Sequence, residues 1–320
     1  MSVLIYVETS EGAIKKTSLE ALCYGVKVAV SQGKPAEALV LGEVDSDLSA
    51  LGAYGVKKVH HAASSVFNHL DAGLHTAAIA EAAVRVGAEV VVLSNNLTGK
   101  AVAPRLSVRL KAGLVAGAVA LPDLSNGFTV KRNVFSGKAF ANVSVLTPVK
   151  ILSLQPNAYP VTAGSGSADV ASIELSVGEP RIKVTETRKV KGTVPLSEAE
   201  RVISGGRGLK GPENWGLVED LAGLLGAATA CSRAVADAHW RPHHEHVGQT
   251  GGSIAPNLYF AIGISGAIQH LAGVNRSKVI VVVNKDPEAP FFKAADYGIV
   301  GDAFEVMPRV IEAVRQLKAR

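Results

Sequence analysis

Short apolar runs alternate along the chain with segments whose apolar residues recur every three or four positions. In the first part, runs rich in Val and Leu have the length and composition of buried parallel strands. They are residues 3–8, 38–41, 58–61 and 89–93. Helical spacing occupies residues 18–32, 70–86 and 98–110. Repeated strand and helix units predict an α/β fold, in which a mainly parallel sheet is flanked by helices.

The pattern changes after this region to successive strands joined by short turns. The predicted strands are residues 128–133, 139–146, 149–154 and 181–185. A glycine and serine stretch at 163–167 is typical of a surface loop. The polar stretch 187–200 contains the predicted domain boundary, which divides the chain into residues 1–194 and 195–320. We also expect any hinge between the domains to lie there.

The second part again alternates strand and helix. The predicted strands are residues 201–203, 227–230, 258–264 and 279–284, and the predicted helices are 212–226, 232–238, 267–272 and 307–319. Glycine and polar blocks follow several of these strands. Because the carboxyl ends of parallel strands meet at one edge of a sheet, these blocks are expected to converge on a single ligand.

The block Ser204-Gly205-Gly206-Arg207-Gly208 is the first of these. It is expected to open the helix at 212, whose free backbone N–H groups would suit a pyrophosphate. The spacing matches neither the dinucleotide fingerprint nor a Walker loop, because Lys210 is not followed by Ser or Thr. An ordinary turn is the alternative interpretation.

Composition limits the other possibilities. A chain of 320 residues with 48% hydrophobic residues is long enough for two folded domains. Cys23 and Cys231 lack ligand spacing, which favours a reducing compartment and disfavours disulfides. The apolar stretches are too short for a secretory signal or a membrane span. The net charge of +5 could attract an acidic partner, but scattered basic residues and 5% aromatics disfavour nucleic acid.

Several further blocks follow in a fixed order: Cys231-Ser232-Arg233, Val247-Gly248-Gln249-Thr250-Gly251, Ser265-Gly266-Ala267-Ile268-Gln269-His270, Asn284-Lys285-Asp286-Pro287 and Ala295-Asp296-Tyr297-Gly298. Together with the first block they closely resemble the FAD-binding half of the electron transfer flavoprotein alpha subunit, or FixB, family. The resemblance is dense from about residue 204 onward and thin before it. It implies a Rossmann-like FAD-binding domain at residues 195–320 and a first domain that associates with a partner subunit.

The resemblance also implies one FAD per chain and the residues that hold it. These are Arg207, Ser232, Arg233, Val247, Gly248, Gln249, Thr250, Ser265, Gly266, Ala267, Ile268, Gln269, His270, Asn284, Asp302 and Ala303. The two arginines are expected beside the isoalloxazine and His270 near its C2 carbonyl oxygen. Positive charge there would compensate the reduced ring. Ser232 and Thr250 are expected near N5 and C4, the 265–270 block beneath the diphosphate and ribityl chain, and Asn284 and Asp302 at the adenosine end.

Each of these residues has a structural alternative. Arg207 and Arg233 could be surface arginines, and Ser232 and Ser265 could cap the helices that follow them. In the loop 239–246, a metal site could be formed by His243, His244 and His246, although a solvated loop is the preferred interpretation. No G-x-S-x-G elbow, catalytic triad or acid–base pair is visible, so we predict no catalytic residues and no metal.

The resemblance implies a heterodimer with a beta subunit that carries AMP. Acyl-CoA and other dehydrogenases of fatty acid beta-oxidation would donate electrons, and the acceptor would be a protein such as electron transfer flavoprotein quinone oxidoreductase. The chain would then be a carrier rather than an enzyme. The expected location is the cytoplasm, or the mitochondrial matrix in a eukaryotic source, although no transit peptide is visible.

Other functions stay open. One is a role in an electron-bifurcating or nitrogen-fixation-linked complex. A second is a dinucleotide-dependent oxidoreductase that acts on a small substrate, and a third is a nucleotide-binding regulatory module without a redox role.

Overall fold

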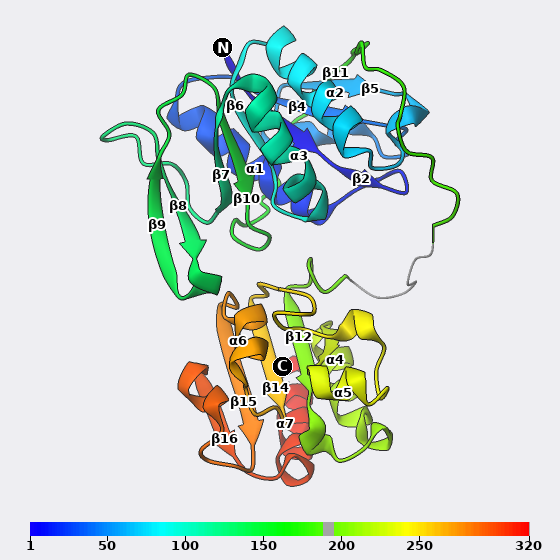
Figure 1. Cartoon of the computed structure of the whole chain (residues 1–320), viewed down its shortest axis with the longest axis vertical. Coiled ribbons are helices and arrows are strands. Elements are labelled where there is room, and N and C mark those ends of the chain that lie inside the picture. The colour runs from blue at the N-terminus through cyan, green and yellow to red at the C-terminus, as the bar shows by residue number, and fades with distance from the viewer. Residues whose placement is uncertain (188–194, 320) are drawn as a thin grey trace. The chain divides into compact units, whose positions relative to one another are not determined.

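A computed structural model describes residues 1–187 and 195–319, which form two compact units (Figure 1). Of these residues, the first unit contains 1–134 and 139–187, and the second contains 135–138 and 195–319. The predicted boundary between residues 194 and 195 is not tested, because residue 194 and most of the predicted hinge lie outside the described residues. Both stay predictions.

The first unit is built on a nine-stranded sheet in the order β11-β5-β4-β1-β6-β10-β7-β8-β9. Its strands are β1 (Ser2–Val7), β4 (Ala36–Leu41), β5 (Lys58–Ala62), β6 (Ala88–Ser94), β7 (Gly113–Ala118), β8 (Thr129–Val134), β9 (Ala139–Ser144), β10 (Lys150–Leu154) and β11 (Asp169–Ser172). The strands pair in parallel except at β8, which runs antiparallel to both β7 and β9. A small ribbon of β2 (Thr9–Ser10) and β3 (Ala13–Ile14) stands apart from this sheet.

Helices cover both faces of this sheet. Successive residues of β1 point to opposite faces, so Ile5 packs on the side of α1 (Lys16–Ser31), whereas Leu4 packs on the side of α2 (Ala72–Arg85) and α3 (Leu97–Leu110). Both side chains are fully buried. The bounds of the strands and helices between residues 3 and 110 agree with the predicted bounds to within a few residues at each end, so these predictions are confirmed.

Three details of the first unit differ from the prediction. Residues 181–185 form no strand; they are largely exposed, and the Arg181 N–H donates to the Asp71 carboxylate instead of to a neighbouring strand. The edge strand β11 was missed because most of its residues are exposed, which gives no hydrophobic run. The strand β7 was missed because it is rich in glycine and alanine, which have a low propensity for β-strands.

The second unit contains a fully parallel five-stranded sheet in the order β13-β12-β14-β15-β16. Its strands are β12 (Arg201–Gly205), β13 (Ala228–Cys231), β14 (Leu258–Ile262), β15 (Val279–Asn284) and β16 (Tyr297–Val300). Its α-helices are α4 (Gly216–Leu225), α5 (Arg233–Asp237), α6 (Ile268–Val274) and α7 (Ala303–Lys318). One apolar core packs α4, α5 and α7 against one face, and another core covers the opposite face with α6.

Strand order creates a crevice in this sheet. The chain passes from β12 outward to β13 on one side, and then returns to β14 on the other side of β12. The carboxyl ends of β12 and β14 therefore lie at the point where the winding direction reverses, which is where open α/β sheets bind ligands.

The fold prediction is confirmed at the level of two α/β units with mainly parallel sheets flanked by helices. The Rossmann-like description stays a prediction. The helix predicted to start at 212 begins at Gly216, because Pro212–Asn214 form a 3₁₀ turn. The strand β16 was missed because its apolar run is only four residues long and is interrupted by Gly298. No helix in residues 1–187 or 195–319 combines the length and apolar character needed to cross a membrane.

Candidate functional site

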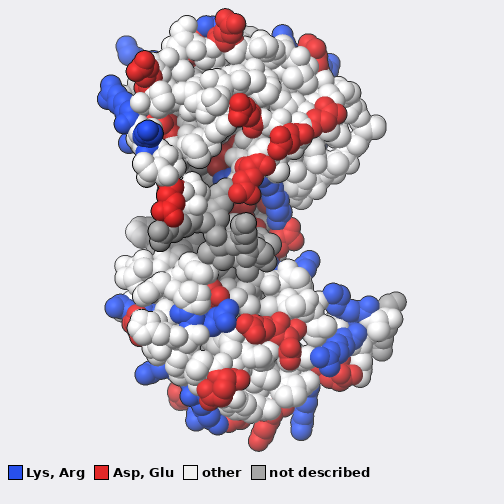
Figure 2. Space-filling view, turned by 90° about the vertical axis from the view of Figure 1, so that its right-hand side faces the viewer, with Lys and Arg blue, Asp and Glu red and all other residues white. Residues whose placement is uncertain are grey.

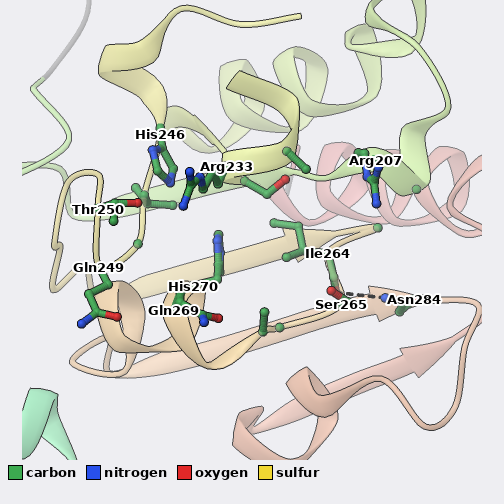
Figure 3. A pocket seen from close by; sticks show the side chains of 18 of the residues that line it. Arg207, Arg233, His246, Gln249, Thr250, Ile264, Ser265, Gln269, His270 and Asn284 are labelled. Carbon is green, nitrogen blue, oxygen red and sulfur yellow. Dashed lines mark hydrogen bonds between the residues drawn. The ribbon is translucent and has the colours of Figure 1, made fainter. Parts of the chain in front are cut away.

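A pocket of about 500 Å³ lies at the carboxyl ends of the strands of the second unit (Figure 3). Its walls come from the segments after β12, β13, β14 and β15, together with the loop before β14. The lining residues are Arg207, Gly208, Ser232, Arg233, Ala234, His246, Val247, Gly248, Gln249, Thr250, Gly263, Ile264, Ser265, Gly266, Ala267, Gln269, His270, Asn284 and Asp286. Segments far apart in sequence therefore meet at one pocket, as their positions after parallel strands predict.

The structure places all the predicted site residues at this pocket except Ile268, Asp302 and Ala303. Ile268 starts α6 and is exposed, and Ala303 is the first residue of α7 and is buried in an apolar core. Asp302 caps α7 by accepting the N–H of Phe304 at 2.9 Å. This hydrogen bond is the main reason that the pKa of Asp302 lies below its usual range. Its predicted contact with the adenosine end stays a prediction.

The glycines after β12 have a packing role that the sequence did not reveal. A Cβ on Gly206 would lie 2.3 Å from the carbonyl oxygen of Gly263, and a Cβ on Gly208 would lie 2.7 Å from the Cα of Gly263. The Gly208 N–H also donates to the Gly263 carbonyl at 3.0 Å. These glycines let the loops after β12 and β14 join backbone to backbone. They do not open a helix as predicted, since α4 begins only at Gly216.

Two other glycines in the pocket wall need a backbone that other residues rarely adopt. Gly248 has φ +148°, and Gly266 has φ +79°. A Cβ on Gly266 would also lie 2.7 Å from the Cα of Phe291.

The cationic side chains of the pocket are exposed. In Figure 3, Arg207 and Arg233 lie on one side of the pocket, while Ser265, Gln269 and His270 lie on the other. Nε of Arg233 lies 3.2 Å from Oδ2 of Asp237, one helical turn further along α5. On the face of the molecule shown in Figure 2, acidic and basic side chains are interspersed among the described residues.

Ser232 and Ser265 do not act as the side-chain caps that the alternative interpretation required. Ser232 occupies the N-cap position of α5, but its side chain makes no capping hydrogen bond. Ser265 is not a cap at all, because α6 begins at Ile268 with Ala267 in the N-cap position. The Ser265 carbonyl instead accepts the Phe291 N–H at 3.1 Å. Both hydroxyls are thus available to a ligand.

Asn284 joins two walls of the pocket. Its Nδ2 donates to the Ile264 carbonyl at 2.9 Å, and its Oδ1 accepts the Asp286 N–H at 3.0 Å. The first of these bonds is drawn in Figure 3. Asn284 therefore fixes the ends of β14 and β15 relative to each other, which the resemblance alone did not show.

His270 is buried on α6, and its two ring nitrogens differ in their hydrogen bonding. Nε2 lies 2.8 Å from the Tyr259 hydroxyl, whereas Nδ1 has no hydrogen-bond partner among the described residues. Burial lowers the pKa of His270 to about 4. The ring is therefore neutral at pH 7, and Nδ1 is the ring nitrogen that has no hydrogen-bond partner among the described residues.

This burial predicts how acid affects stability. Between the unfolded-state pKa near 6.5 and the folded-state value of about 4, the unfolded chain binds the extra proton, so stability falls as pH falls through this window. From pH 7 to pH 5 the loss due to His270 should be about 2 kcal/mol. Urea denaturation at both pH values should show this loss in the wild type and a smaller loss in His270→Gln.

The wild type must be compared with His270→Gln because burial also lowers the pKa values of His75 and His246. These two histidines therefore also reduce the stability of the protein as the pH falls. An equal loss in the wild type and in His270→Gln would contradict the assignment to His270.

The histidine-rich loop contributes one residue that the sequence prediction missed. His246 is buried and lines the pocket, whereas His243 and His244 are exposed. Arg241 from the same loop forms an ion pair with Glu245 at 2.7 Å. In residues 1–187 and 195–319, no three His, Cys, Asp or Glu side chains are grouped as metal ligands would be. The position of His246 next to the Val247 block was the available sequence signal.

The parallel sheet, the pocket at its switch point and the glycine-rich walls define a nucleotide-binding α/β protein. Residues 195–275 match the family model described as electron transfer flavoprotein FAD-binding domain, and residues 3–177 match the electron transfer flavoprotein domain. The chain belongs to the electron transfer flavoprotein alpha subunit family, so the resemblance is confirmed. An electron transfer role and a flavin cofactor follow at the level of the family.

The relatives match over almost the whole chain. The electron transfer flavoprotein subunit alpha of Bacillus subtilis is 36% identical over 98% of both chains. A relative from Cryptococcus neoformans var. grubii, named as a mitochondrial subunit of the same kind, is 38% identical over 99% of this chain and 93% of its own. Protein FixB of Clostridium saccharobutylicum is 33% identical over 98% of this chain and 96% of its own.

Proposed function

We propose that this chain is the FAD-binding alpha subunit of a heterodimeric electron transfer flavoprotein. It accepts electrons from dehydrogenases and passes them one at a time to an acceptor protein. The observation that carries this proposal is the pocket itself, which combines two arginines with a buried histidine nitrogen that has no hydrogen-bond partner in residues 1–187 or 195–319.

The residues of the pocket fit FAD. A volume of about 500 Å³ is typical of a small-molecule site that encloses part of a ligand. Gly248 and Gly266 bring backbone to the wall without side chains, which suits the approach of a flat ring or a diphosphate. The hydroxyls of Ser232 and Thr250 and the nitrogen of His270 supply hydrogen bonds for the polar edge of the ring.

The bound FAD would supply the redox chemistry, and the chain would supply the electrostatic environment. Arg207 and Arg233 would stabilise the negative charge that arrives with an electron. His270 stays neutral at pH 7 because of its burial, so it would act as a hydrogen-bond partner rather than as a further cation. Asn284 would hold the two loops beside the cofactor in place.

The partners follow from the proposed role. A beta subunit carrying AMP would complete the heterodimer, with residues 1–194 of this chain associating with it. The donors would be acyl-CoA and other dehydrogenases, and the acceptor would be electron transfer flavoprotein quinone oxidoreductase or a protein like it. In this role the chain is a carrier rather than an enzyme. We place it in the cytoplasm, or in the mitochondrial matrix of a eukaryotic source.

A second candidate is an electron-bifurcating or nitrogen-fixation-linked complex. This alternative stays open because the chain resembles protein FixB of Clostridium saccharobutylicum, to which it is 33% identical, as well as relatives named as electron transfer flavoprotein alpha subunits. Oxidation of NADH by the heterodimer, or a second flavin on the complex, would favour it over the simple carrier.

Co-expression with the beta subunit tests both candidates. The purified heterodimer should be yellow and contain one FAD for each alpha chain. Reduction by an acyl-CoA dehydrogenase and its substrate should require all three components, and NADH alone should leave the spectrum unchanged. A colourless heterodimer, even after incubation with FAD, would contradict the proposal.

A further inference from the structure

Tyr259 and His270 form a buried hydrogen-bonded pair, and only His270 lines the pocket. Tyr259 lies on β14, is fully buried, and stacks on Phe291 with ring centroids 6.2 Å apart. It does not line the pocket. Its hydroxyl lies 2.8 Å from Nε2 of His270, while Nδ1 of the same ring has no partner among the described residues. One ring nitrogen is thus committed to Tyr259 and the other is available at the pocket.

The direction of this hydrogen bond decides what Nδ1 can do. A neutral imidazole has one N–H donor and one acceptor nitrogen, so Nδ1 carries the proton only if Nε2 does not. Burial keeps His270 neutral and keeps Tyr259 protonated, because it lowers the pKa of the histidine and raises that of the tyrosine.

The chemistry of the two groups favours one direction. A phenolic O–H, with an ordinary pKa of about 10, is a more acidic donor than the N–H of a neutral imidazole. The unprotonated imidazole nitrogen is also more basic than a phenolic oxygen. The hydroxyl of Tyr259 therefore donates to Nε2, and the proton of the ring stays on Nδ1.

We infer that Tyr259 is a positioning residue, which holds His270 in the Nδ1–H form so that Nδ1 donates a hydrogen bond to an acceptor atom of the bound flavin ring. The carbonyl oxygens and unprotonated ring nitrogens of a flavin are such acceptors. The inference rests on the proposed function for the identity of the ligand. The control of the tautomer by Tyr259 does not depend on the ligand.

The tautomer can be measured directly. The heterodimer is prepared with ¹⁵N-labelled histidine, and the signals of His270 are assigned by their loss in His270→Gln. In the wild type, Nε2 should have the chemical shift of an unprotonated nitrogen and Nδ1 that of a protonated one, before and after removal of FAD. A protonated Nε2 in the wild type would overturn the inference.

Tyr259→Phe is the matched variant, because it keeps the ring and its stacking on Phe291 but removes the hydroxyl. The Nε2 proton occupancy should rise in this variant, and the dissociation constant for FAD should rise roughly tenfold, the effect of one lost hydrogen bond to a ligand. Tyr297→Phe removes a hydroxyl from a residue that is 67% exposed, and should leave both measurements unchanged. An unchanged tautomer in Tyr259→Phe would overturn the inference.

A double-mutant cycle separates positioning from general damage to the core. If Tyr259 acts through His270, Tyr259→Phe should weaken FAD binding in the wild type but have little further effect in His270→Gln. Equal effects in both backgrounds would overturn the inference. A heterodimer without affinity for FAD would contradict the proposed function instead, while the NMR measurement would still report the tautomer.

Discussion

Replacing Arg233 by alanine should lower the one-electron reduction potential of bound FAD and change its content much less. The arginine lines the pocket, and its charge would stabilise the extra negative charge that reduction brings. Because its side chain is 67% exposed, water and salt screen the effect. We expect a shift of about 60 mV, which is one tenfold change in a one-electron equilibrium. Spectroelectrochemical titration of the heterodimer measures it.

Two controls accompany this variant. Asp237→Asn removes the carboxylate that faces Arg233, and it should shift the potential in the opposite direction. Arg315→Ala removes a comparable surface arginine, which pairs with Glu312 on α7 and does not line the pocket. It should leave the potential unchanged. An Arg233→Ala variant that loses FAD but keeps the potential of the remaining flavin would place the arginine at the wrong part of the cofactor.

Replacing Gly266 by alanine should destabilise the second unit by about 3 kcal/mol and reduce FAD incorporation severely. The left-handed backbone at φ +79° is strained for alanine, and the new methyl group would meet backbone atoms of Phe291. Since the Phe291 N–H is bonded to the adjacent Ser265 carbonyl, relief of the clash would move the pocket wall. Urea denaturation and the FAD content of the purified heterodimer measure the two effects.

Gly223→Ala is the matched control. Gly223 lies within α4, and a Cβ there meets nothing within 4 Å. Alanine should stabilise this helix by about 0.5 to 1 kcal/mol and leave FAD binding unchanged. If Gly266→Ala were as stable as the wild type and bound FAD normally, the wall near Phe291 would have to be more adaptable than its packing indicates.

The strands that build the sheets could be predicted because their signal is local. Residues 279–284 form a continuous apolar run that ends in Asn284, and the structure gives β15 the same bounds. Parallel strands with polar residues at their ends then imply a shared binding edge. The exposed edge strands β11 and β16 are only four residues long and have no continuous apolar run, and β11 pairs with β5, which is more than 100 residues earlier in the sequence.

The pocket could be predicted as a set of residues but not as a set of contacts. The order of the glycine and polar blocks identified most of its walls. The contact between Gly206 and Gly263, the pairing of Tyr259 with His270 and the capping role of Asp302 all depend on how separate segments pack. The sequence also suggested capping by Ser265, which fails because α6 begins three residues later.

The contact between the loops after β12 and β14 affects how quickly electrons could move. These loops meet closely through the backbone of Gly206, Gly208 and Gly263, and the side chain of Ile264 packs against Gly206. Closely packed loops of this kind would keep their peptide dipoles in one arrangement whether a bound cofactor is charged or neutral. Little structural reorganisation would then accompany the transfer of each electron. In the proposed role, such stiffness would let an electron cross without a partner protein first having to rearrange these loops.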